Sequence, residues 1–130
     1  MRAQFIEAIK RFELGELRVG EQLPRAESGT NMWIKNPRVI YVSEPTYEMN
    51  PLITALNGAH IWAKSTSLTV IWSTDSKKLA ANYQSVVDQL LELRAIDPQA
   101  GFNSREAVLT TNYENDLLVT QIEYTFVKLT

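Results

Sequence analysis

The chain has 130 residues, a length that corresponds to one domain, residues 1–130, with a hydrophobic core of its own. Hydrophobic residues make up 45% and charged residues 22%, and the net charge of −2 lacks the basic surplus typical of nucleic-acid binders. The absence of cysteine excludes disulfides, thiolate nucleophiles and cysteine-ligated metals. No apolar run reaches the roughly 20 residues that span a bilayer, so we expect no membrane association.

The first predicted element is an amphipathic N-terminal helix, and its charge pattern is unlike that of a signal peptide. Its apolar positions share one helical face: Phe5, Ile6, Ile9 and Phe12. Gly15 is placed to end this helix. The segment Glu16–Asn36 contains dispersed glycine and proline and predicts a long irregular loop. Within it, Trp33 either packs over the core of its own chain or contacts a partner, and we favour packing over the core.

A short strand is predicted over Pro37–Glu44, because the segment PRVIYVSE is apolar on both faces. Pro45 ends the strand. The segment Thr46–Gly58 is interpreted as a loop that closes with an Asn57-Gly58 turn.

The segment Ala59–Trp72 alternates without interruption by glycine or proline and predicts a strand. It is about 14 residues long, or roughly 46 Å, whereas ordinary strands have about 5–6 residues. One face carries His60, Trp62, Lys64, Thr66, Leu68, Val70 and Trp72. Either the strand bends near Lys64–Ser67 or part of it projects beyond the core. A projecting strand exposes backbone groups that invite pairing with another chain.

The remaining sequence predicts a second helix and a hairpin. Residues Ser73–Ser76 are helix N-cap types. The following helix has an apolar stripe and ends before Pro98; the stripe is formed by Leu79, Tyr83, Val86, Leu90 and Leu93. Strands are predicted over Ala107–Tyr113 and Leu117–Leu129. The order of elements predicts an α+β fold: an antiparallel sheet of mixed strand lengths with two helices on one face.

Groups suited to catalysis are few. His60 is the only histidine, and no histidine or carboxylate at metal-ligand spacing accompanies it. Four acidic residues lie near predicted strand ends: Glu44, Glu48, Glu114 and Asp116. We expect no catalytic, cofactor or metal site, and therefore not an enzyme. The alternative is a small enzyme or ligand-binding domain that uses His60 with Glu44 or Glu48.

From Phe5 to Leu129 the chain resembles a known family in size, element order and texture. The features are the amphipathic helix, the strand Pro37–Val42, the long strand, a capped helix and a C-terminal hairpin ending in Ile122–Phe126. This layout resembles the tail terminator proteins of long-tailed bacteriophages, the minor tail protein U type of lambdoid phages.

The resemblance implies a structural virion protein at the head-proximal end of the tail, assembled in the host cytoplasm. It would form a homohexameric ring that caps the tail tube protein and meets the head-side connector, with DNA passing through the lumen. A head-completion or neck protein is the alternative within the virion.

Contacts with other subunits are predicted where the chain cannot build a core. We expect Tyr47, Met49, Trp62 and Lys64 to lie at subunit or tube interfaces, because interfaces are enriched in aromatic residues and methionine. The competing interpretation is that Tyr47 and Trp62 pack over the sheet of their own chain.

Overall fold

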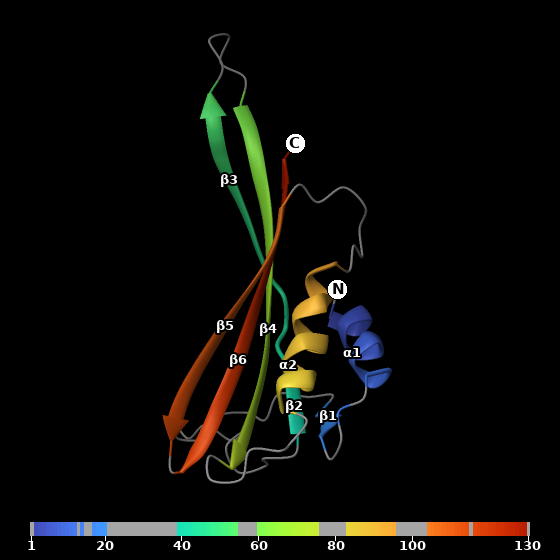
Figure 1. Ribbon diagram of the computed structural model, residues 1–130. Coiled ribbons are helices and arrows are strands. Elements are labelled where there is room, and N and C mark those ends of the chain that lie inside the picture. The colour runs from blue at the N-terminus through green and yellow to red at the C-terminus, as the bar shows by residue number, and fades with distance from the viewer. Residues whose placement is uncertain are drawn as a thin grey trace.

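The computed structural model describes residues 2–12, 14, 17–20, 39–54, 60–75, 83–95, 104–114 and 116–129. In these ranges the elements are α1 Arg2–Lys10, β1 Arg18–Gly20, β2 Val39–Val42, β3 Thr46–Thr54, β4 His60–Asp75, α2 Tyr83–Leu91, the 3₁₀ turn η2 Glu92–Ala95, β5 Ser104–Glu114 and β6 Leu117–Leu129. The strands form one sheet in the order β1-β2-β4-β6-β5, and β3 also pairs with β4. Both helices lie against the same face of the sheet (Figure 1). The predicted α+β class is confirmed.

The core lies between this face of the sheet and the helices. The ring of Phe5 of α1 makes T-shaped contacts with the rings of Tyr124 and Phe126 of β6, at centroid distances of 5.1 and 5.9 Å. The Tyr124 hydroxyl donates a hydrogen bond to the Leu90 carbonyl near the end of α2. Burial of the phenol raises the pKa of Tyr124 above its usual range. In both helices, the apolar face predicted from the sequence is the face that is buried, as far as its residues are described.

The strands β4 and β6 are the longest elements and pair antiparallel from Ala63↔Leu129 to Asp75↔Leu117. The alternation predicted for β6 is confirmed, with one face buried and the other more exposed. At the β5–β6 turn, Glu114 pairs with Leu117, so two residues form the connection. Asp116 there has a φ of 63°, which short hairpin turns require.

The prediction of a loop over Thr46–Gly58 is wrong, because Thr46–Thr54 form β3 and pair antiparallel with β4. Polar residues and Pro51 obscured the strand pattern. The register shifts between Pro51 and Ile53, and an irregularity of this kind accommodates a residue without an N–H group. The predicted Asn57-Gly58 turn lies outside the described residues.

The prediction that Glu16–Asn36 is irregular throughout is also wrong at Arg18–Gly20. These residues form β1, which runs parallel to its neighbour β2. Gly20 was interpreted as a loop residue, but it permits close approach instead. A Cβ at this position would lie 2.7 Å from Cγ1 of Val39. Gly15 and Trp33 lie outside the described residues.

Of the four residues predicted to cap the second helix, Ser73–Asp75 belong to the preceding strand, and Ser76 lies outside the described residues. Ser73–Asp75 continue β4, and the Ser73 side chain is fully buried. Leu79 and Pro98 lie outside the described residues, so the predicted start and stop of that helix are not described. The buried strand β2 agrees with its prediction, since all its side chains are covered.

Candidate functional site

The feature that sets this fold apart is a ribbon that extends past the helices. It consists of β3 and the paired residues His60–Ser67 of β4, and we call it the projecting ribbon. In Figure 1 the ribbon (green) rises beyond both helices, and the C-terminal end of β6 lies beside it. Strand β4 runs through body and ribbon as one element of 16 residues. Of the two outcomes predicted for this strand, projection is therefore the observed one.

The structure brings the four predicted interface residues together on the projecting ribbon. In the register, Met49 lies directly opposite Lys64, and Trp62 lies opposite Pro51. Tyr47 is 66% exposed, Met49 55% and Trp62 37%, and Lys64 is exposed as well. Tyr47 and Met49 therefore project into solvent, whereas Trp62 is partly covered. Their role in an interface stays a prediction.

All four residues lie on the face of the sheet that the helices cover further along. Alternate residues of a strand share a face, so Trp62 and Lys64 lie on the same face as the buried Trp72. Directly opposite residues of antiparallel strands also share a face, which places Tyr47 and Met49 there too. The apolar face of the core thus continues onto the ribbon, where no described element covers it.

A groove lies on the ribbon near its base, with a volume of about 270 Å³. We call it the lysine groove, and its lining residues are Tyr47, Glu48, Met49, Lys64, Ser65, Thr66 and Lys128. Lys128 of β6 lies directly opposite Lys64 of β4. Like charges that face each other across strands are unfavourable. Among the described residues neither lysine has a carboxylate within ion-pair distance.

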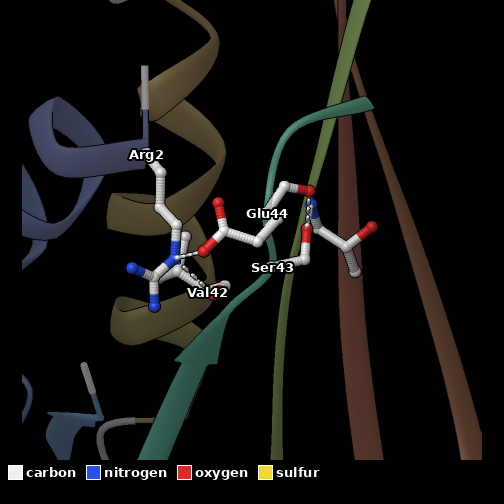
Figure 2. A network of polar contacts seen from close by, with 5 residues as sticks. Arg2, Val42, Ser43 and Glu44 are labelled. Atoms are coloured by element: carbon white, nitrogen blue, oxygen red, sulfur yellow. Dashed lines mark hydrogen bonds and ion pairs between the residues drawn. The ribbon is translucent and has the colours of Figure 1, made fainter. Parts of the chain in front are cut away.

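The junction between ribbon and body is fixed by Ser43, which connects β2 to β3 along the same edge of β4. The Ser43 N–H donates to the Thr69 carbonyl, and the Thr69 N–H donates to Oγ of Ser43, both at 2.8 Å (Figure 2). A side-chain oxygen thereby takes the place of a strand carbonyl. The same hydroxyl donates to the Glu44 carbonyl at 3.2 Å.

Helix α1 also contacts this junction through Arg2. Its Nε donates to the Val42 carbonyl at 3.0 Å and lies 3.7 Å from Oε1 of Glu44 (Figure 2). The Glu44 side chain is 80% exposed, so this ion pair contributes little to stability. The kink that redirects the chain from body to ribbon is therefore held mainly by hydrogen bonds of Ser43 and Arg2.

A second exposed apolar surface, which the sequence did not predict as a site, lies on the edge strand β5. Leu109 and Tyr113 lie opposite Ile122 and Leu118, and so on the helix side of the sheet. Tyr113 is 71% exposed and Leu109 41%, and Val108 on the other face is exposed too. The strand has three consecutive apolar residues, Ala107–Leu109, followed by the polar residues Thr110–Asn112. Nothing in that pattern reveals that it forms an edge.

The histidine–carboxylate pair considered from the sequence is not assembled by the fold. His60 begins β4 opposite Thr54, whereas Glu48 lies opposite Ser65. The backbone positions of His60 and Glu48 are thus separated by on the order of 16 Å along the ribbon, too far for a hydrogen bond between their side chains. Glu44 lies further away, at the junction. Asp116 occupies the β5–β6 turn.

Within the described residues no cluster of histidine and acidic side chains is arranged to hold a metal ion. None of the described helices is long and apolar enough to cross a membrane. No protein-family model matches the chain, and comparison with curated proteins gives no match.

Proposed function

We propose that this protein is the subunit of a homohexameric ring that caps the tail tube of a long-tailed bacteriophage and joins it to the head-side connector. The observation that carries the proposal is the projecting ribbon, which bears exposed Tyr47, Met49 and Trp62 beyond the helices. Among the ribbon side chains that the structure describes, only Ala63 and Thr66 are buried, so the extension adds little to the core of a monomer. Its exposed apolar side chains are instead suited to burial against another molecule.

The placement of a second apolar surface supports a ring in particular. Rings form when two different surfaces of each subunit meet head to tail and the rotation closes. The ribbon edge β3 and the strand β5 lie on opposite edges of the β4–β6 pair. No described strand covers the outer edge of either. Two separate exposed surfaces on one chain are what a head-to-tail contact requires.

Sedimentation of the full chain at several concentrations, with and without purified tail tubes, tests the proposal. We expect a hexamer that forms at high concentration or on tube ends, where electron microscopy would show one ring per end. A chain that stays monomeric and never joins tubes would contradict the proposal. Binding to connectors but not to tubes would instead support the head-completion or neck role.

A further inference from the structure

The lysine groove contains a charge arrangement that the isolated chain does not neutralise. Lys64 and Lys128 face each other across β4 and β6 beside the exposed side chains of Tyr47 and Met49. Glu48 also lines the groove, but it lies opposite Ser65, so its position alternates to the other face of the ribbon. An acidic partner surface would remove the repulsion between the two ammonium groups.

The helix α2 and the turn η2 present the opposite arrangement on the outside of the helix layer. Gln84, Asp88 and Glu92 are exposed and follow one another at four-residue spacing along one helical face. Two carboxylates at this spacing repel each other. Arg94, the basic residue of this stretch, donates to the Leu91 carbonyl at 3.3 Å and pairs with neither carboxylate. We call Gln84, Asp88 and Glu92 the acidic face.

Apolar side chains accompany both charged surfaces. The strand β5 contacts η2, and its exposed Leu109 lies on the helix side of the sheet, opposite Ile122. The two carboxylates thus lie on the same side of the sheet as Leu109, and the lysine groove combines two ammonium groups with Tyr47 and Met49. The two surfaces are complementary in charge.

We propose that the lysine groove of one copy of this chain binds the acidic face of a second copy. The inference rests on the self-association in the proposed function and specifies which surfaces meet. The contact joins the ribbon of one subunit to the helix layer of the next, and so it is head to tail. In that contact each like-charged pair gains two counter-charges, which favours the correct pairing of subunits over others.

Charge exchange between the two surfaces tests the contact. The full chain carrying Lys64→Glu and Lys128→Glu, and the full chain carrying Asp88→Lys and Glu92→Lys, are each expected to associate about tenfold or more weakly in sedimentation. The chain carrying all four changes keeps the net charge of −2 and is expected to assemble again. An equimolar mixture of the two double variants is also expected to assemble, with alternating subunits.

A matched control carries Arg11→Glu and Arg18→Glu, two exposed basic residues away from the groove, and changes the net charge as the lysine reversal does. We expect it to assemble like the wild type. Lys64→Gln with Lys128→Gln provides a second measurement that does not introduce new charges into β4, and it is expected to weaken association less than the reversal. Far-UV circular dichroism and urea midpoints establish that each variant is folded.

The outcomes separate this inference from the proposed function. If the wild type assembles but the fourfold variant and the mixture do not, the contact is wrong while the ring stands. Assembly of either double variant at the wild-type concentration also overturns the contact. If the wild type never associates, with or without tail tubes, both the contact and the ring are wrong. Restored assembly only upon exchange supports the contact.

Discussion

One strand, β4, passes through two regions, of which the helices cover one and not the other. In the body, Leu68, Val70 and Trp72 lie under the helices and are almost fully buried. In the projecting ribbon the same face carries Trp62 and Lys64, which are exposed. Backbone pairing continues through both regions. The strand pattern alone therefore does not set burial; the helix layer ends and the apolar face remains.

The two tryptophans of this face provide the sharpest test of that comparison. Trp72→Ala removes a fully buried side chain beneath α2 and is expected to cost about 3–5 kcal/mol in free energy of unfolding. Urea denaturation of the variant measures this cost. Nε1 of Trp72 has no hydrogen-bond partner among the described residues, so Trp72→Phe should cost much less. Equal stability of Trp72→Ala and the wild type would contradict the assigned core.

The corresponding change in the ribbon should affect association instead of folding. Trp62→Ala is expected to leave the monomer folded and to weaken self-association by about 2 kcal/mol if Trp62 is a hot spot. Sedimentation measures association, and a urea midpoint close to that of the wild type is the control. A variant that unfolds would show that Trp62 belongs to the core and that this site assignment is wrong.

Within the body, the hydrogen bond from Tyr124 to Leu90 should contribute less than the tryptophan packing. Tyr124→Phe leaves a carbonyl without this donor and is expected to cost about 1–2 kcal/mol in free energy of unfolding. Because burial raises the pKa of Tyr124, the folded state holds this proton more tightly than the unfolded state. The stabilisation of the folded state by the neutral Tyr124 phenol is therefore present below about pH 10 and is lost as the pH rises further.

Urea unfolding at neutral and alkaline pH checks both parts of this prediction. Between about pH 9 and pH 11 the wild type should lose stability more steeply than Tyr124→Phe, since the variant lacks the phenol that titrates. Parallel curves for the two proteins would mean that Tyr124 does not link stability to pH.

The junction should show the smallest of these effects. Ser43→Ala leaves the Thr69 N–H without its acceptor and is expected to cost about 1 kcal/mol. In the Ser43→Ala variant, backbone amide hydrogens should exchange faster in β3 than in the body. Glu44→Gln, a change to an exposed ion pair next to Ser43, is the matched control and should cost no more than about 0.5 kcal/mol. A larger loss of unfolding free energy for Glu44→Gln than for Ser43→Ala would contradict our assignment, in which hydrogen bonds of Ser43 and not the ion pair of Glu44 hold the junction.

Elements that bury an apolar face could be predicted from sequence, because burial imposes a period on the residues. The helix α1 and the strands β2 and β6 agree with their predictions for this reason. The strand β3 was not predicted, because none of the described helices covers it and selects an alternating pattern, and because Pro51 argued against a strand. The strand β1 was not predicted, because it is only 3 residues long and ends in glycine.

The candidate site was predictable in part. Tyr47, Met49, Trp62 and Lys64 could be selected because a chain of this size cannot cover so long a strand. Lys128 could not be selected, because its place opposite Lys64 follows from the register of two strands far apart in sequence. The exposed side chains of β5 were missed for a related reason: the edge position is a property of the whole sheet.

The continuous pairing of β4 with β6 gives the ribbon a mechanical character. A force applied to the ribbon along β4 loads all the β4–β6 residue pairs, from Ala63↔Leu129 to Asp75↔Leu117, at once and in shear. A force that pulls β3 sideways meets its pairs with β4 one at a time, from the tip towards Ser43. The ribbon is thus rigid along its length and peels from only one side, so a load on it is transmitted directly into the sheet beneath the helices.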